Sequence, residues 1–558
     1  MQLDLAAAAS SIVPSTHAPS SWPFAGLAAH ELLPHLLALL SADTSSILQH
    51  AQACWLNNEG NAVIGILPKV AWQVYPAGFN MANTGADTAN KEEANNREAA
   101  NKDVAITVVK NTRAIDTNLG HFSPAEESRY DTTYREWIEE LIAYSQRYEQ
   151  SSRSDNHSNT DAAASAIEAP NGNHYQHGLM GFIGYDIAAK QLSPQLGPQQ
   201  GILLAEQPSA YLGHYDIYLS PCAQGWQLTI DPSVQDFLSS AYYDTLMAKL
   251  SQLDQQLATF SSLMTPPPLL LAPTWQYPHY ECAFSKTQNY LYQGDSYQIN
   301  LTQPWRGQRA VLTESNGESK PATLLNYLPA LHNNTSAPFA GYVGLTDFEL
   351  LSCSPELFLV FEKSADGANH IRTKPIKGTR PRGHDASSDR ALRDELEASD
   401  KDRAENVMIV DLLRNDLGKY AQTGSVKVPK LFAIESFSNV HHLVSTITAT
   451  IKEDVHPLTV LFGSLPAGSI TGTPKKRAVE IIAELEVAPR GAYCGTLGYM
   501  NFDGSGQWNV LIRTLQANHN GQVSLWAGGG ITVGSDCAAE YQECVDKVGN
   551  LLEVLANS

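Results

Sequence analysis

Cysteine is scarce and unpatterned in this sequence. The chain of 558 residues has seven cysteines, and no two of them form a CxxC pair or sit beside a His-rich segment. A disulfide framework and a structural zinc site both need cysteines at short, regular spacing, so we expect neither. We therefore expect a soluble protein of a reducing compartment, the cytoplasm.

Positive charge is the second shortage. Lys plus Arg number 37 against 58 Asp plus Glu, which gives a formal net charge of -21. Nucleic acids and anionic membranes both favour basic surfaces, so neither is an expected partner. A small anionic substrate stays compatible with this balance, because a few cations can dominate one local site.

The sequence also predicts neither a secretory signal nor a membrane span. The first basic residue is Lys69, so the N-terminus lacks the positively charged start of a secretory signal. No apolar run reaches the length of about 18 residues that a membrane helix needs. Hydrophobic residues make up 43% of the chain, which is typical of a globular protein.

Composition divides the chain into two predicted domains, 1–270 and 275–558, separated by the prolines at 266–268. Two stretches near 82–103 and 150–174 contain almost no large apolar side chains. Such segments cannot bury enough surface to offset the entropy lost on ordering, so we expect flexible insertions there.

Short strands outnumber helices and arrive in consecutive groups, which favours an α+β fold over a regular βαβ sheet. Strands are predicted at 63–67, 70–74, 178–186, 297–301, 357–362, 371–375, 444–451, 495–501, 508–515 and 523–527. Helices are predicted at 134–148, 280–293, 387–418 and 538–555, and a further helix is expected to begin with Thr473 as N-cap and Pro474 at its first position.

A turn after the strand at 371–375 concentrates cations. Lys374, Lys377 and Arg380 surround a proline and a glycine. Such donors are suited to binding carboxylates or phosphates. A solvated charged turn is the more common explanation, but the apolar pair 375–376 beside Lys377 is unusual in an exposed loop.

Carboxylates recur at helical spacing in two segments. Asp402 and Glu405 are three residues apart, and Glu540 and Glu543 repeat the spacing near the C-terminus, followed by Lys547. Side chains at this spacing share a helical face, so two such helices could meet around a divalent cation, and oxygen ligands favour magnesium. Ordinary surface acid, stabilised by the pairing of Glu543 with Lys547, is the alternative.

Two glycine-rich segments would allow a ligand to approach the backbone closely. The loop 468–472 leads into the predicted helix start with Lys475 beside it, which is typical of an anion site, although the spacing is not that of a nucleotide P-loop. The glycines at 528–530 follow a strand, where a bulge or tight turn explains them equally well.

The segments from 275 onward, taken in order, resemble the chorismate-utilising enzymes. The matching segments are GDSYQINL (294–301), SPE (354–356), PIKGT (375–379), DRAENVMIVDLLRNDLG (402–418), GSVKVP (424–429), HHLVSTI (441–447), GSITGTPK (468–475), AYCGTLGY (492–499), IRTL (512–515), AGGGI (527–531) and AEYQECVDK (539–547). In the N-terminal half the resemblance is fainter and rests on GFIGYD (181–186). It implies large, mainly antiparallel β-sheets flanked by helices, in an anthranilate synthase component I-like fold.

The resemblance implies amination of chorismate to 4-amino-4-deoxychorismate, which serves p-aminobenzoate and folate synthesis. Lys377 is implied to attack C2 of chorismate and expel the C4 hydroxyl, after which ammonia adds at C4 and releases the lysine. This chemistry needs an unprotonated amine, which a desolvated site beside other cations favours. Glu356 is implied to be the general acid and then the general base.

The resemblance also implies a cofactor and a set of substrate contacts. Glu405 and Glu543 match the magnesium ligands of the family, with Asp402 and Glu540 as outer carboxylates, and the ion would meet the ring carboxylate of chorismate. The positions that match substrate contacts are Gly378, Thr379, His442, Thr471, Tyr493, Arg513, Gly528, Gly529 and Gly530. Arg513 is the expected bidentate partner of the enolpyruvyl carboxylate.

Other activities within the family fit the residues less well. Anthranilate synthase component I has alanine where this chain has Lys377. Isochorismate and salicylate synthases carry a lysine in the segment where this chain has Gln298. A catalytically silent chorismate-binding or regulatory subunit is disfavoured because Lys377, Glu356, Glu405 and Glu543 occur together.

The expected partners are chorismate and a glutamine amidotransferase subunit. No glutaminase segment is recognisable in the chain, so ammonia is expected from a separate subunit or from solution. Tryptophan binding, known in some relatives, is disfavoured because the segment 338–340 departs from their pattern and no clear serine element occurs near residues 57–58.

Overall fold

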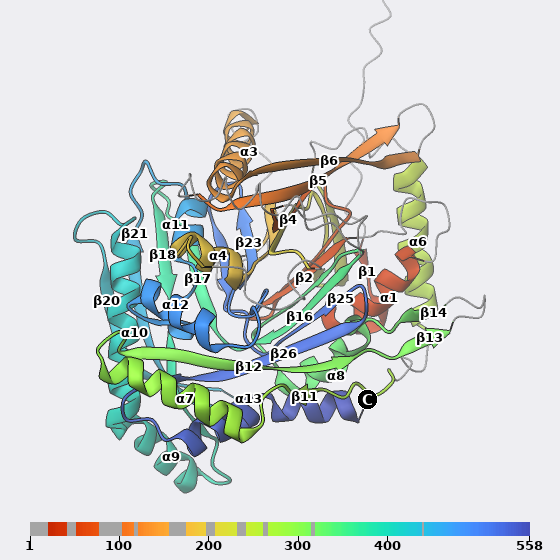
Figure 1. Cartoon of the computed structure of the whole chain (residues 1–558). Helices are drawn as coiled ribbons and strands as arrows, with labels where there is room; N and C mark the ends of the chain where they lie inside the picture. Colours follow the sequence, from red (N-terminus) through yellow and green to blue (C-terminus); the bar gives the residue numbers. More distant parts are fainter. Residues whose placement is uncertain are drawn as a thin grey trace, which may run out of the picture.

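Two large antiparallel β-sheets dominate the structure, a computed structural model that describes residues 21–41, 52–77, 103–116, 121–155, 174–196, 207–231, 241–259, 266–313, 319–437 and 440–557 (Figure 1). The predicted insertion near 82–103 lies almost wholly outside these residues. Of the one near 150–174, residues 150–155 continue a helix and 156–173 lie outside the description.

The first sheet has 12 strands in the order β1-β10-β9-β3-β2-β15-β16-β25-β26-β12-β11, with β22 paired to β12. Their bounds are β1 (Ser21–Trp22), β10 (Gly225–Ile230), β9 (Ile217–Cys222), β3 (Asn61–Ile66), β2 (Ala53–Asn58), β15 (Phe339–Gly344), β16 (Phe348–Ser354), β25 (Thr514–Asn518), β26 (Gln522–Ile531), β12 (Gln298–Gln308), β11 (Ala272–Pro273) and β22 (Gly472–Thr473). A separate two-stranded ladder joins β13 (Val311–Thr313) and β14 (Ser319–Pro321).

The second sheet also has 12 strands, in the order β19-β21-β18-β17-β24-β23-β7-β8-β4-β5-β6, with β20 paired to β21. Their bounds are β19 (Ile376–Pro381), β21 (Val440–Thr450), β18 (Asn369–Thr373), β17 (Leu357–Lys363), β24 (Gly506–Asn509), β23 (Thr496–Asn501), β7 (Gly178–Ile183), β8 (Ala210–His214), β4 (Val70–Pro76), β5 (Ala105–Asp116), β6 (His121–Thr133) and β20 (Lys427–Ser436).

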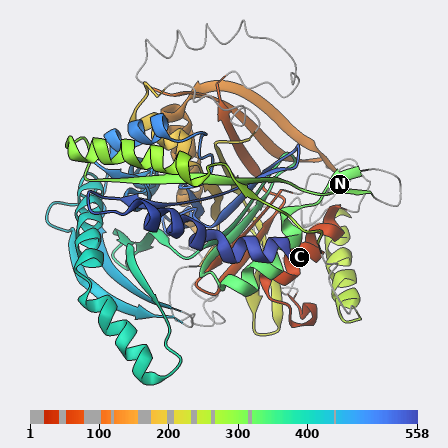
Figure 2. The ribbon, with the colours of Figure 1, turned by 60° about the horizontal axis from the view of Figure 1, so that its bottom comes forward.

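Helices cover the outer faces and ends of the sheets. They are α1 (Ala29–Ser41), α3 (Tyr134–Asp155), α4 (Tyr185–Leu192), α6 (Ala241–Leu257), α7 (Tyr277–Tyr292), α8 (Leu328–Thr335), α9 (Ala386–Ala398), α10 (Asp400–Gly418), α11 (Pro457–Ser464), α12 (Lys475–Leu485) and α13 (Cys537–Ala556). Helix α10 packs on β21, and α13 packs on β26, as Figures 1 and 2 show. Among the described helices, none combines the length and apolarity needed to cross a membrane.

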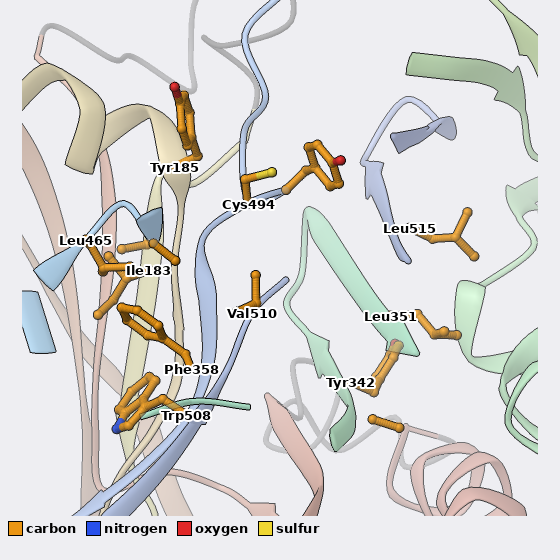
Figure 3. Close-up of a cluster of buried hydrophobic side chains, with 14 of the residues drawn as sticks. Ile183, Tyr185, Tyr342, Leu351, Phe358, Leu465, Cys494, Trp508, Val510 and Leu515 are labelled. Carbon is orange, nitrogen blue, oxygen red and sulfur yellow. The ribbon is translucent and has the colours of Figure 1, made fainter. Parts of the chain in front are cut away.

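The core fills the space between the two sheets, because each sheet presents an apolar face to the other. Figure 3 shows this cluster, with Tyr342, Leu351 and Leu515 from the first sheet and Ile183, Phe358 and Trp508 from the second. All of them are buried. Burying a large side chain of this kind contributes about 1.5–3 kcal/mol, so the sheet interface is a main source of stability.

Each sheet joins a block of strands from before residue 275 to a block of strands from after it. In the first sheet β2 pairs with β15, and in the second β7 pairs with β23, each in antiparallel register. The N-terminal strands therefore belong to the same layers as the strands that carry the predicted site residues.

The α+β class is confirmed, and most predicted elements are present, but two end earlier than predicted. The strand predicted at 178–186 stops at Ile183, where the chain turns into α4. The helix predicted at 387–418 is broken at Ser399, which leaves the helical region with ψ 105°. The Ser399 hydroxyl accepts the Asp402 N–H at 3.3 Å and so caps a new helix, a local competition that side-chain periodicity does not reveal.

The strand predicted at 508–515 is in fact two strands in different sheets. Strand β24 ends at Asn509 and β25 begins at Thr514, so the residues between them cross from the second sheet to the first. Arg513 lies in this crossing with φ +52°, a conformation outside the strand region. The crossing places Arg513 at the junction of the two sheets.

Candidate active site

Four separate elements bring the predicted catalytic residues together. Glu356 precedes β17, Lys377 lies in β19, Glu405 is on α10, and Glu543 is on α13. Burial acts to raise the pKa of all three glutamates, and the charge of Lys377 opposes that effect on each of them. A single lysine therefore lies within electrostatic reach of the predicted acid–base residue and of both predicted metal ligands.

Glu356 is buried, with 9% of its surface exposed. Burial raises its pKa above the usual value, and this effect is partly offset by the charge of Lys377, by the Ser469 hydroxyl and by the charge of Lys547. Its backbone is fixed as well, because its carbonyl accepts the Val510 N–H at 3.0 Å. A carboxyl group with a raised pKa can be protonated in one step and ionised in the next, as acid–base catalysis requires.

Strand β19 reaches the site because Gly378 lets it lie directly against α10. Gly378 has φ +84°, and a Cβ atom there would lie 2.8 Å from Cγ of Asp402 and 2.8 Å from Cδ1 of Leu396. Any larger residue would push the strand away from the helix. The pairing with β21 is also irregular between Ile376 and Thr379, so Lys377 sits in a local bulge rather than in a regular ladder.

The acidic residues of α10 and α13 form one cluster. Burial raises the pKa of Glu405, and the charges of Asp402 and Glu543 raise it further against the opposing effect of Lys377 and Lys401. Burial also raises the pKa of Glu540, whose carboxylate accepts the Ser535 hydroxyl at 2.7 Å. Like charges held this close make the cluster favourable for a cation.

Glu543 differs from its neighbours because Lys547 pairs with it at 2.6 Å. Burial opposes ionisation of Glu543, but Lys547, Lys377 and Lys401 outweigh burial and lower its pKa. Glu543 therefore ionises more readily than Glu405 and Glu540, whose pKa values are raised. Among the described residues no group of three or more His, Cys, Asp or Glu side chains is arranged as a complete metal site.

The glycine strand, which is the part of β26 formed by residues 528–530, lies against the same cluster. A Cβ atom on Gly529 would lie 2.6 Å from Oε2 of Glu540, and the Gly528 carbonyl accepts the Lys547 ammonium at 2.8 Å. A Cβ atom on Gly530 would lie 2.6 Å from Nε2 of Gln298. The glycines therefore allow the backbone of β26 to approach α13 and β12 more closely than any other residue would.

Thr379 and His442 face each other across β19 and β21. The Thr379 hydroxyl is 2.9 Å from Nδ1 of His442. Burial, together with a smaller effect of the charge of Arg513, lowers the pKa of His442 to about 4. His442 is therefore neutral at physiological pH. Arg513 is exposed to solvent, but the protein around it lowers its pKa. Its charge acts on His442.

Thr471 and Tyr493 are packed more deeply. Thr471 is fully buried, and its hydroxyl donates to the Ala467 carbonyl at 2.8 Å. Tyr493 is also buried and stacks on Trp526 of β26, with ring centroids 5.8 Å apart. Both predicted contacts thus lie in the layers that support the glycine strand.

The helix predicted after the loop 468–472 is present, but it begins at Lys475, so the assignment of Thr473 as its N-cap and of Pro474 as its first residue is wrong. Thr473 belongs to β22, where its carbonyl accepts the Tyr297 N–H at 2.8 Å, and Pro474 takes the N-cap position without a side-chain cap. Lys475 does not face an open anion site, because its ammonium donates to Asp416 at 2.6 Å and to the Ser464 carbonyl at 2.9 Å. Pairing with β12 outweighs the local preference of threonine for an N-cap.

Sequence reasoning assigned no role to two residues of this region. Ser469 is one polar residue of a glycine-rich loop, and nothing in its spacing indicates its effect on Glu356. Gln298 is buried at 1% exposure, and neither atom of its amide has a hydrogen-bond partner among the described residues. Its position next to Gly530 marks it as a polar group facing the site, which only the fold reveals.

The chain belongs to the chorismate-binding enzyme family. The family model, described as "chorismate binding enzyme", matches residues 116–553. The predicted resemblance is therefore confirmed, and it extends well into the N-terminal half.

Individual relatives differ in how much of the chain they match. Aminodeoxychorismate synthase component 1 of Salmonella typhimurium is 39% identical over 388 residues, which cover 69% of this chain and 78% of that protein. Anthranilate synthase component 1 of Bacillus subtilis is 42% identical over 219 residues, 39% of this chain and 41% of that protein. The crystal structure of anthranilate synthase component I from Streptococcus pneumoniae has a TM-score of 0.61 at 20% identity, covering 88% of this chain and 91% of that one. The predicted fold is thereby confirmed.

Proposed function

We propose that this chain is the chorismate-aminating component of an aminodeoxychorismate synthase. The observation that carries the proposal is the convergence of Glu356, Glu405 and Glu543 around Lys377, the residue that distinguishes amination at C4 in the predicted mechanism. The long match to component 1 of the Salmonella enzyme supports the same choice.

The proposed reaction consumes chorismate and ammonia and yields 4-amino-4-deoxychorismate and water. The Lys377 amine forms a bond to C2 while the C4 hydroxyl leaves, and Glu356 supplies the proton that converts it to water. Ammonia then forms a bond to C4, the bond from C2 to lysine breaks, and Glu356 removes the proton from the new amine. Lysine and glutamate both return to their starting states, so the cycle is balanced.

The acidic cluster is the proposed magnesium site. Glu405 and Glu543 would hold the ion, with Asp402 and Glu540 behind them, since these oxygen donors and their mutual repulsion suit a hard cation. When bound, Mg²⁺ would neutralise the ring carboxylate of chorismate and polarise the ring.

Substrate recognition is proposed to rest on groups around this centre. Arg513 would pair with the enolpyruvyl carboxylate. Thr379 would orient the substrate with neutral His442, and the backbone of 528–530 would line the opposite side. Ammonia is proposed to come from a glutamine amidotransferase subunit, in the cytoplasm, and the product to serve p-aminobenzoate and folate synthesis.

Identifying the product tests this proposal directly. The purified chain is incubated with chorismate, Mg²⁺ and an ammonium salt, and the products are separated and identified by mass spectrometry. We expect aminodeoxychorismate. Formation of anthranilate would establish the alternative suggested by the Bacillus relative, and chorismate binding without turnover would establish a regulatory subunit.

A variant of the acid–base residue makes the test more specific. Glu356→Gln keeps the size of the side chain but removes its proton transfer, so the rate of product formation should fall by about 10²–10⁴-fold. The measurement is kcat at saturating ammonium, with chorismate affinity as the control. Unchanged kcat would exclude the assigned role of Glu356.

A further inference from the structure

Arg490 is a fully buried cation in the loop between α12 and β23. Its guanidinium donates to both carboxylate oxygens of Glu486, at 2.7 and 2.9 Å. It also donates to the Asn300 carbonyl at 2.7 Å and to the Ile470 carbonyl at 3.0 Å. One buried ion pair therefore ties α12 to β12 and to the loop that contains Ile470. A planar guanidinium that donates several hydrogen bonds at once holds its partners in place more strongly than a single hydrogen bond does.

The loop held by this guanidinium is the one that reaches Glu356. Asn300 donates its side-chain amide to the Ile470 carbonyl at 3.0 Å and its backbone N–H to the Thr471 carbonyl at 2.8 Å. The hydroxyl of Ser469, the residue before Ile470, favours the ionised form of the Glu356 carboxyl group. A shift of the Ile470 carbonyl would therefore move the Ser469 hydroxyl relative to the carboxyl group of Glu356.

The GFIGYD segment (181–186) holds the other side of Arg490. The ring of Tyr185 lies under the guanidinium, with 4.6 Å from Cζ to the ring centroid. The Asp186 carboxylate accepts the N–H of Arg490 at 3.2 Å and the N–H of Gly491 at 2.6 Å, while Tyr185 donates its N–H to the Gly491 carbonyl at 2.9 Å. These contacts fix both the backbone and the charge of Arg490.

We propose that Arg490 is a positioning residue for the acid–base step, and that GFIGYD is the part of the N-terminal half that holds it in place. Arg490 acts through the Ile470 carbonyl on Ser469, and through Ser469 on Glu356. The inference rests on the proposed function for the role of Glu356. The GFIGYD motif of the N-terminal half thereby has a positioning role, although none of its residues takes part in the proposed reaction.

Three variants test the chain of contacts. Ser469→Ala removes the last contact in this chain. In the pH profile of kcat, the limb that reports ionisation of Glu356 (the pH limb) should therefore shift to higher pH. Asp186→Asn and Tyr185→Leu loosen Arg490 without leaving a buried charge unpaired. They should shift the same limb in the same direction and lower kcat by about tenfold, because small misplacement of a catalytic group has a large effect on rate. KM for chorismate should change less than kcat.

Two controls separate positioning from stability. In Tyr185→Phe the ring is kept, and since the Tyr185 hydroxyl has no hydrogen-bond partner among the described residues, activity should match the wild type. Glu349→Gln weakens another buried ion pair, with Arg309, at the far end of β16 from Glu356. It should lower the melting temperature and leave the pH limb in place. Lys377 and Lys547, the charged groups that act on Glu356, are unchanged in every variant.

Hydrogen exchange provides a readout that does not depend on turnover. In Asp186→Asn and Tyr185→Leu, amide exchange should become faster in the peptide that spans 468–473, and it should not in Tyr185→Phe. If the two loosening variants only lower the melting temperature, and neither the pH limb nor loop exchange moves, the inference is wrong. If the wild type forms no aminodeoxychorismate, the proposed function fails, while loop exchange still decides whether Arg490 holds the loop.

Discussion

Lys377 and Lys475 look alike in the sequence but differ in the folded protein. Each follows a proline and has a glycine nearby, and each was a candidate anion-binding residue. The Lys475 side chain is only 10% exposed, and its ammonium is bound by Asp416 at 2.6 Å. Lys377 forms no ion pair with the described residues, although its charge acts on several carboxyl groups. The difference teaches that the partners of a lysine, rather than its local motif, decide whether its amine is available for chemistry.

The largest effect should come from removing the available amine. In Lys377→Met, aminodeoxychorismate formation should fall by about 10³-fold or more, because the covalent step is lost. The melting temperature should stay close to that of the wild type, since no ion pair is broken. Steady-state kinetics and thermal unfolding of the same preparation check this. Substantial residual turnover with the same product would contradict nucleophilic catalysis by this residue.

Lys475→Met should give the opposite result. It leaves Asp416 buried without its main partner, which should lower the free energy of unfolding by about 3 kcal/mol. Urea denaturation measures this change. The double variant Lys475→Met with Asp416→Leu should recover much of the loss, because both members of the pair are then apolar. If the single variant is as stable as the wild type, the two lysines do not differ in the way the contacts indicate.

A smaller effect should appear in the response to Mg²⁺. Glu405→Gln removes one proposed ligand while keeping its size, so more Mg²⁺ should be needed for the same rise in melting temperature. Glu553→Gln, on the same helix as Glu543 but near its end, is the matched control and should respond as the wild type does. An identical Mg²⁺ response in both variants would place the ion elsewhere.

The smallest effect concerns pH. His442 has its pKa lowered to about 4, below the ordinary value of 6.5, mainly by burial. The unfolded chain therefore takes up a proton more readily, and His442 contributes stability above pH 6.5 that is lost as the pH falls toward 4. His442→Gln should make the loss of stability between these pH values less steep, measured by urea denaturation at several pH values. An unchanged slope would show that His442 is not held neutral.

The ordered motifs of the second half predicted the family, the fold class and the residues that surround Lys377. Motifs carry this information because each one fixes a short segment whose chemistry is visible in its residue types. They could not predict the break at Ser399 or the strand role of Thr473, because a side-chain cap in one case and pairing with β12 in the other depend on what lies nearby in space. For the same reason the motifs could not predict the effect of Ser469 on Glu356 or the contact of Tyr185 with Arg490.

The joining of strands from both halves within each sheet has a practical consequence for anyone dividing this protein. A fragment beginning at residue 275 would lose β2 beside β15 and β7 beside β23, and so would expose unpaired strand edges in the middle of both layers. Open edges of this kind pair readily with other chains, so we expect such a fragment to aggregate rather than to fold. The same constraint applies to an exchange of the N-terminal half between relatives, because the new half must still pair β2 with β15 and β7 with β23.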